Sequence, residues 1–274
     1  MSSTQRMADE RHRYVLEQLQ QYGSCKVSEL ARQLGVSEMT IHRDLAHLAR
    51  LNLLRKVHGG AVLRNYIEQT FQDRAVQNHE AKVAIARRAL ELVRPGSSLY
   101  LAPGSTAHEL ALVLDQQGLQ VYTNSLPTAT ALARSNQAGV SVTLLGGQVV
   151  GFVEALVGPS TEAALSDLKL TCAFIAVTGV SLEGGLTIYT EEEARVIRGV
   201  MRAARKTVLL TDASKYDLVV GPQVGRLEDV HIVISDSMPE SYRRHCQAHD
   251  VEVLLCGDPD GGLESGASDR RNQA

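Results

Sequence analysis

The sequence predicts an α/β protein with an N-terminal winged helix-turn-helix over residues 1–63 and a mainly parallel α/β domain over residues 79–256. Three observations predict this division. Residues 26–50 contain two short amphipathic helix patterns separated by a glycine, and a basic segment with two adjacent glycines follows at residues 53–63. Beyond a polar stretch, short runs of Val, Leu and Ile alternate with helical patterns, as in a parallel sheet covered on both faces. The length of 274 residues suits two domains.

The first two helices form a helix-turn-helix pattern. Ser28 is the predicted N-cap of the first helix, because its hydroxyl can accept a bond from an unpaired backbone N–H. Gly35 follows where a left-handed residue ends a helix at little steric cost. Ser37 then caps the second helix, in which Ile41, Leu45 and Leu48 share one apolar face.

The opposite face of the second helix presents cations and small side chains. Such a face is suited to base edges and phosphates in the major groove of double-stranded DNA. The candidate DNA contacts of the two helices are Ser28, Ser37, Met39, Thr40, His42, Arg43, His47 and Arg50.

A basic hairpin follows the helices. Arg55, Lys56 and His58 precede Gly59 and Gly60, which permit positive φ and a close approach to a backbone. We interpret the hairpin as a wing that adds contacts to DNA. A three-helix module that binds protein is the alternative, but the combination of caps, outward arginine and basic hairpin favours DNA.

The charge distribution agrees with this interpretation. Residues 1–63 hold nine Lys and Arg against six Asp and Glu, a net charge of +3. Because the whole chain has a net charge of −3, residues 64–274 carry −6. A local basic surface steers one end of a molecule toward DNA.

The α/β part is predicted from alternating patterns. Residues 64–78 are expected to form a hinge, and the Gly/Ser/Asp-rich residues 257–274 a disordered tail. The expected strands are 98–102, 119–123, 140–145, 172–178, 207–211, 231–235 and 251–256, and the expected helices are 81–93, 106–117, 126–134, 158–168, 191–205 and 240–248.

Ligands of such sheets bind outside the carboxyl ends of the strands. Gly104, Ser105 and Thr106 follow a strand and open a helix, an arrangement that favours an anion or an ordinary helix cap. Lys215 could supply a full positive charge to the same anion. Five strand-end loops favour one shared ligand site, with these candidate residues: Gly104, Ser105, Thr106, Thr123, Asn124, Gly146, Gly147, Gly179, Asp212 and Lys215.

Other patterns exclude several classes of protein. Four scattered cysteines without a CxxC pair predict reduced thiols in the cytoplasm. No apolar run is long enough to span a membrane, and the sequence shows no signal peptide. The cluster His245, Cys246 and His249 could suggest a metal, but no fourth ligand is evident, so the polar face of a surface helix is favoured. We therefore expect no metal and no cofactor.

Four stretches of the N-terminal part are similar to the signature of the DeoR family of bacterial regulators. They are Val27-Ser-Glu-Leu-Ala31, Leu34-Gly-Val-Ser-Glu-Met-Thr-Ile41, Arg43-Asp-Leu45 and His58-Gly-Gly-Ala61. One position departs from the family, because His42 stands where an arginine is usual. This exchange weakens one cationic contact and bears on operator preference.

The resemblance extends over residues 80–236 and implies a domain similar to ribose-5-phosphate isomerases. It implies a phosphorylated sugar or related metabolite as effector, which releases a repressor of a catabolic operon from DNA, and a homo-oligomer, either dimer or tetramer. Ala102 departs from the family, which usually has an aspartate there. The stretches that carry the resemblance are Pro103-Gly-Ser-Thr106, Thr123-Asn-Ser125, Leu145-Gly-Gly147, Gly185-Leu-Thr187 and Asp212-Ala-Ser-Lys-Tyr216.

The alternative function is a sugar-phosphate isomerase with a fused DNA-binding module. Isomerisation needs a base near the substrate. Glu191, Glu192, Glu193 and Asp212 are the obvious acids near the loops, and the three glutamates begin a helix, where acids complement the dipole. The sequence therefore favours a regulator that is not an enzyme.

Overall fold

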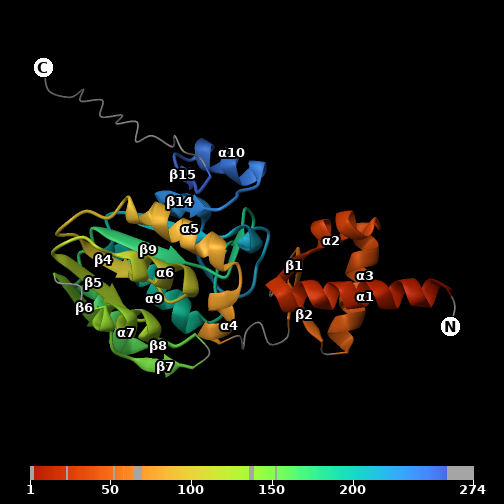
Figure 1. The fold of residues 1–274 in the computed structure, drawn as a ribbon, viewed down its shortest axis with the longest axis horizontal. Helices are drawn as coiled ribbons and strands as arrows, with labels where there is room; N and C mark the ends of the chain where they lie inside the picture. Colours follow the sequence, from red (N-terminus) through yellow and green to blue (C-terminus); the bar gives the residue numbers. More distant parts are fainter. Residues whose placement is uncertain are drawn as a thin grey trace, which may run out of the picture.

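The computed structural model describes residues 3–22, 24–51, 53–57, 59–63, 70–135, 139–151 and 153–257. The N-terminal helices and the α/β sheet form two separate bodies (Figure 1). Three expectations lie outside the described residues: the position of His58 in the wing, the first part of the hinge, and disorder of the tail beyond residue 257.

The N-terminal body is a winged helix-turn-helix. Helices α1 (Ser3–Tyr22), α2 (Val27–Leu34) and α3 (Glu38–Arg50) pack on a small antiparallel sheet. Its strands are β1 (Ser24–Lys26), β2 (Leu54–Val57) and β3 (Gly60–Leu63), in the order β1-β3-β2. The predicted helix-turn-helix and hairpin are confirmed.

The turn and the core of this body follow the sequence pattern. Gly35 ends α2 in the left-handed region at φ 64°, and the Ser37 hydroxyl accepts a bond of 3.2 Å from Thr40 N. Ile41, Leu45 and Leu48 are buried against α1 and α2, as predicted, with Val15, Leu19 and Leu30.

The predicted capping role of Ser28 is wrong. Helix α2 begins at Val27, its N-cap is Lys26, and no side chain caps it. Strand β1 runs directly into the helix, so the Val27 N–H is satisfied by the carbonyl of Gly59 at 2.9 Å instead. Ser28 is exposed in the first turn.

A buried acid fastens α1 to α3. Asp44 accepts hydrogen bonds from Arg11 at 2.8 Å and from His12 at 3.0 Å. Burial alone would raise the pKa of Asp44, but the bonds from Arg11 and His12 outweigh it and hold that pKa below its ordinary value. The clamp fixes the direction in which α3 presents its outer face.

The second body contains a seven-stranded parallel sheet in the order β15-β14-β12-β9-β4-β5-β6. All seven predicted strands are confirmed. They are β4 (Ser98–Leu101), β5 (Leu119–Thr123), β6 (Val140–Leu144), β9 (Cys172–Ala176), β12 (Thr207–Thr211), β14 (Ile232–Ser235) and β15 (Glu252–Leu255).

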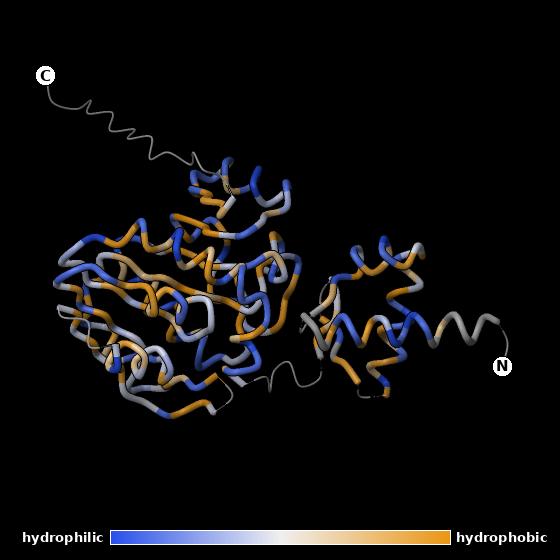
Figure 2. Tube along the Cα trace, in the orientation of Figure 1, coloured by the Kyte–Doolittle hydropathy of each residue, from blue (hydrophilic) through white to orange (hydrophobic). Residues whose placement is uncertain are grey.

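Helices cover both faces of this sheet. Leu99 and Leu101 of β4 pack among α5 (His79–Leu90), α6 (Ser105–Val113) and α7 (Leu126–Arg134). Tyr100 between them packs on the other side, among α8 (Pro159–Ser166), α9 (Glu191–Ala203) and α10 (Glu240–Ala248). Figure 2 shows hydrophobic segments running through the centre of the domain. The six predicted helices are confirmed.

Several short elements were not expected. Helix α4 (Phe71–Val76) begins with a capping box at Thr70, and Phe71 packs edge-on against His108 at 5.0 Å. The later part of the predicted hinge is therefore folded onto the α/β domain. The others are β7 (Gln148–Val150), β8 (Ala155–Val157), β10 (Gly179–Ser181), β11 (Gly185–Thr187), β13 (Gln223–Gly225) and the 3₁₀ turns η2 (Ala213–Lys215) and η3 (Leu227–Asp229).

The strand order defines where a ligand can enter. From β4 the chain proceeds through β5 to β6, then returns to place β9 on the other side of β4. The loop after β4 therefore leads to one face of the sheet and the loop after β9 to the opposite face. A crevice opens between these two loops at the carboxyl ends of the strands. In the described part of the chain, no helix is long and apolar enough to cross a membrane.

Candidate functional site

The outer face of α3 is open to solvent. His42, Arg43 and Arg50 are exposed, and Met39 is 70 % exposed although it is large and apolar. The Ser37 hydroxyl lies 3.0 Å from that of Thr40, so the two candidate hydroxyls are tied to each other at the start of the helix. This face combines cations with an apolar side chain that can contact a thymine methyl group.

The remaining predicted DNA contacts surround that face. His47 is partly buried and stacks on His12 of α1 at 5.0 Å, so it lies at the flank of the exposed outer face of α3. Lys56 is exposed on β2, and Ser28 is exposed on α2. Arg55 lies on β2, although its side chain is not among those described.

A cavity of about 80 Å³ lies in the crevice between β4 and β9. The opening turn of α6 forms one wall, α5 with the segment before it forms another, and α9 closes the inner side. Its lining residues are Arg74, Gln77, Asn78, Lys82, Pro103, Gly104, Ser105, Thr106, Asn124, Val153, Ala176, Val177, Thr178, Ile188, Tyr189, Glu193, Val196, Ile197, Asp212 and Lys215.

The N-terminus of α6 lacks a side-chain cap. Gly104 precedes the helix at φ 133°, a conformation that favours glycine, and as the N-cap residue it supplies no side-chain hydrogen bond to the helix. Ser105 and Thr106 are buried there. The first N–H groups of a helix have no partner within the helix, so this N-terminus and the positive end of its dipole favour an anion in the cavity.

Three cations add to this field: Arg74, Lys82 and Lys215. Lys82 is 4 % exposed, and its ammonium donates to the carbonyl oxygens of Arg74 and Gln77 at the end of α4. Burial, followed by the nearby charge of Lys215, lowers the pKa of Lys82 to about 8. An anion beside this ammonium would stabilise its charged form.

Two carboxyl groups line the same cavity. Asp212 is buried and accepts bonds from Asn78 Nδ2 at 3.1 Å and Ser214 N at 3.0 Å. Burial would raise the pKa of Asp212, but Lys215 and the bonds from Ser214 outweigh it and lower that pKa. Burial raises the pKa of Glu193, which accepts a bond of 2.9 Å from the Thr190 hydroxyl.

The structure brings six of the ten predicted effector residues together and separates the other four from the cavity. Gly104, Ser105, Thr106, Asn124, Asp212 and Lys215 line it.

The four that do not line the cavity have packing contacts instead. Thr123 is fully buried and donates to Leu101 O at 2.7 Å. The Gly146 carbonyl accepts a bond from Thr161. A Cβ on Gly147 would meet that hydroxyl at 2.2 Å, and one on Gly179 would meet Leu218 O at 2.4 Å.

Sequence reasoning missed the cavity residues that precede or belong to α5. Arg74, Gln77 and Asn78 fall in the segment interpreted as a hinge. Lys82 carried a readable signal, because it shares the apolar face of α5 with Ile85, Ala86 and Ala89 at helical spacing. A lysine in such a stripe departs from the apolar pattern, and this departure is the signal that could have singled out Lys82.

A second hollow separates the two bodies of the chain. This cleft of about 740 Å³ is lined on one side by Cys25, Lys26 and Glu29 and on the other by Ala213 and Ser214, among others. Asn78 and Asp212 line both the cleft and the cavity, so they form a wall between the two.

A winged helix-turn-helix joined to a ligand-binding α/β domain defines a DNA-binding transcriptional regulator. Comparison with known families identifies both parts. A family model described as a DeoR-like helix-turn-helix domain matches residues 11–66, and one described as the DeoR C terminal sensor domain matches residues 77–237. The chain belongs to the DeoR family of transcriptional regulators.

Curated relatives span nearly the whole chain. It is 31 % identical to the L-fucose operon activator of Haemophilus influenzae, over 89 % of this chain and 99 % of that protein. It is 31 % identical to a lactose phosphotransferase system repressor of Staphylococcus epidermidis, over 85 % and 93 %. It is 29 % identical to the glycerol-3-phosphate regulon repressor of Haemophilus influenzae, over 90 % and 96 %.

Solved structures resemble the chain only distantly. Ribose 5-phosphate isomerase A from Neisseria gonorrhoeae is 19 % identical and matches with a TM-score of 0.35, over 51 % of this chain and 53 % of that one. This similarity is too slight to bear on function.

Proposed function

We propose that this regulator represses a sugar or related catabolic operon and is released from operator DNA by a phosphorylated, sugar-like effector bound in the cavity. The observation that carries the proposal is the uncapped N-terminus of α6 facing Arg74, Lys82 and Lys215 at the switch point of the sheet. The names of two curated relatives, a lactose phosphotransferase system repressor and a glycerol-3-phosphate regulon repressor, support it.

Different residues of the cavity lining would bind the phosphate end and the hydroxyl end of such an effector. A phosphate group accepts from the first turn of α6 and pairs with the cations. Hydroxyl groups then donate to Asp212 and Glu193, since carboxylates accept hydrogen bonds from sugars. Ala102 is fully buried and does not line the cavity, so Asp212 and Glu193 are the carboxylates that the described lining offers to the effector.

A gel-shift assay on the gene's own upstream DNA tests the proposal. The protein is titrated onto the duplex alone and with a panel of sugar phosphates that includes glycerol 3-phosphate. The proposal expects specific binding that at least one phosphate weakens and that its dephosphorylated form does not. Binding that strengthens with a phosphate contradicts release by the effector, and binding that no phosphate affects removes this effector class.

Catalysis is the alternative that the cavity acids raise. We take Glu193 and Asp212 as effector ligands and the chain as a non-enzyme. Incubation with pentose phosphates tests this assignment: isomerisation above background that is lost in Glu193→Gln or Asp212→Asn would establish an enzyme.

The route from cavity to DNA begins at the turn η2. Asp212 is the N-cap residue of this turn and Lys215 its last residue, and the Ala213 carbonyl accepts a bond of 3.3 Å from the ammonium of Lys26 in the DNA-binding body. The same ammonium lies 3.9 Å from Asp217, and a Cβ on Gly59 in the wing turn would meet the Asp217 carbonyl at 2.6 Å. Lys26 of β1 and Gly59 of the wing therefore both lie against residues 213–217, the segment that contains or adjoins the proposed effector ligands Asp212 and Lys215.

Effector binding therefore moves the support of the DNA-binding body. An anion that draws Lys215 toward α6 shifts η2 and alters its contact with Lys26. In a homo-oligomer, two α3 helices must match major grooves one DNA turn apart, so a small rotation is costly. This mechanism requires a homo-oligomer, which we include in the proposal together with a cytoplasmic location.

Replacing Lys26 by Met is expected to uncouple the two sites. Operator affinity is measured by anisotropy and sugar-phosphate affinity by calorimetry, each without the other ligand. Both affinities should stay within about twofold of wild type, because Lys26 lies neither on the outer face of α3 nor in the cavity lining. The effector's influence on operator affinity, typically about 5- to 150-fold in coupled systems, should largely disappear.

Lys169→Met serves as the matched control for this variant, because Lys169 is exposed between α8 and β9. A Lys26→Met protein that releases DNA as fully as wild type would exclude this route.

A further inference from the structure

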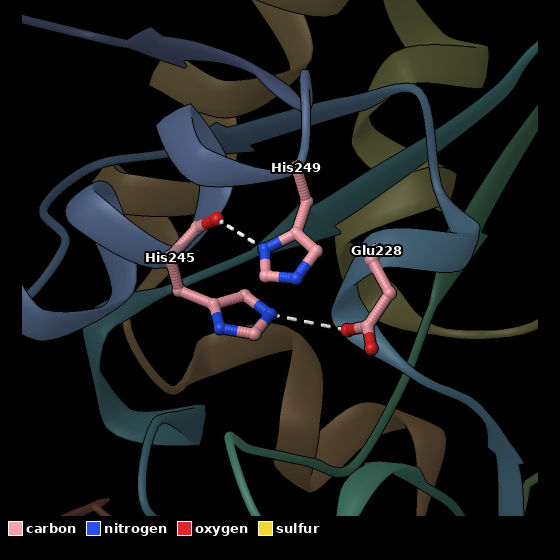
Figure 3. A group of neighbouring side chains, drawn as sticks. All are labelled: Glu228, His245 and His249. Carbon is pink, nitrogen blue, oxygen red and sulfur yellow. Dashed lines mark hydrogen bonds and ion pairs between the residues drawn. The ribbon is translucent and has the colours of Figure 1, made fainter.

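A cluster of two histidines and one glutamate lies apart from the effector cavity and shares none of its lining residues. His245 lies in the last turn of α10, His249 is the C-cap residue of that helix, and Glu228 lies in η3. One nitrogen of each ring and a carboxylate oxygen lie within 4.8 Å of one another. Figure 3 shows the three side chains converging on one point.

We propose that Glu228, His245 and His249 bind a divalent transition-metal ion of the Zn²⁺ type, which fastens the end of α10 to η3. Two imidazole nitrogens and one carboxylate oxygen form a donor set that suits zinc and its neighbours rather than Mg²⁺ or Ca²⁺. A water molecule completes the tetrahedron.

The two rings are arranged as ligands. They are four residues apart on one helix face, stack with centroids 4.2 Å apart and are inclined by 27°, so that they present their edges side by side. His249 Nδ1 lies 2.9 Å from the carbonyl oxygen of His245. Donation to that carbonyl leaves Nε2 with its lone pair directed at the gap, the outer-shell arrangement that metal-binding histidines usually have.

Contacts with Arg226 and His245 hold the Glu228 side chain in position to act as the third ligand. One of its oxygens lies 2.6 Å from Arg226 Nε, and the other lies 3.1 Å from His245 Nε2. These two contacts hold the carboxylate beside the imidazole nitrogens. Metal binding at His245 Nε2 replaces the hydrogen bond to Glu228: the hydrogen moves to Nδ1 of the neutral ring, and the Nε2 lone pair and the carboxylate oxygen both face the cation.

The structure supplies the ligand that the sequence did not reveal. His245 and His249 alone are a common feature of a polar helix face. Glu228 lies 17 residues before His245 and is placed beside it by the folding of η3 against α10. Cys246, between the histidines in sequence, is fully buried on the opposite side and does not belong to the cluster.

Calorimetric titration with Zn²⁺ tests the site. The full chain, without a histidine tag and stripped with a chelator, should bind one Zn²⁺ and melt several degrees higher with saturating metal. His249→Gln and Glu228→Gln should each weaken binding by at least about tenfold and remove the shift in melting temperature.

His42→Gln is the matched control, since His42 is exposed on α3 and far from the cluster in sequence. Titration with Co²⁺ identifies the donors: a nitrogen and oxygen site gives visible d–d bands without a thiolate charge-transfer band. Zinc binding that persists in both cluster variants, a thiolate band, or no binding at micromolar Zn²⁺ would overturn the proposal.

Discussion

Replacing Arg43 by Ala is expected to weaken operator binding by about 10- to 100-fold while leaving sugar-phosphate binding unchanged. Arg43 is exposed in the N-terminal half of α3, the part of a reading helix that approaches base edges. The Asp44 clamp beside it holds α3 against α1, so the loss reflects the missing guanidinium rather than a displaced helix.

Anisotropy titrations at several salt concentrations separate the two contacts that Arg43 can make. Loss of a phosphate contact lowers the slope of log affinity against log salt by about one, whereas loss of a base contact leaves the slope and relaxes sequence preference. Arg87→Ala on the exposed side of α5 is the control. Unchanged operator affinity in Arg43→Ala would mean that another surface reads the DNA.

Replacing Lys82 by Met is expected to weaken sugar-phosphate binding by roughly 10- to 100-fold, because a hydrogen bond to a charged group contributes about 1.5–3 kcal/mol. Operator affinity should not change, so the variant should bind DNA and fail to respond at effector concentrations that release wild type. Lys215→Ala tests a second cation of the same wall, and Lys169→Met is the control. A normal response in both cavity variants would place the phosphate elsewhere.

The pH dependence of effector affinity distinguishes a direct contact from a structural role. Burial lowers the pKa of Lys82 to about 8 in the free protein, and a bound phosphate raises it again. Binding therefore takes up a proton above pH 8, so the contribution of Lys82 to affinity is constant below about pH 7 and falls roughly tenfold by pH 9. Lys82→Met should abolish this fall. Calorimetry at both pH values provides the measurement.

The strands and the helix-turn-helix could be predicted because each carries its own local pattern. Phe174 and Ile175 lie in an apolar run, and Gly35 and Ser37 mark the turn between α2 and α3. The short elements could not be predicted: α4 has one buried apolar anchor, Phe71, and the three-residue strands are too brief to show a period.

Only part of the candidate cavity could be predicted, because some of its residues are brought there by long-range packing and not by a local sequence pattern. Gly104 and Asp212 follow strands, and strand ends meet at one edge of a parallel sheet. The position of Lys82 depends on how α5 lies across that edge, which is decided by packing between distant residues. Gly146 and Gly147 resemble binding-loop glycines in sequence, yet the packing of Thr161 against them is visible only in the fold.

The most direct test of the account is the effector affinity of the protein measured free and saturated with operator DNA. If a sugar phosphate releases the repressor through the cavity, linkage requires the operator to weaken sugar-phosphate binding by the same factor by which the phosphate weakens operator binding. We expect equal factors in wild type and factors close to one in Lys26→Met. Equal effector affinity for free and operator-bound wild type would contradict the account.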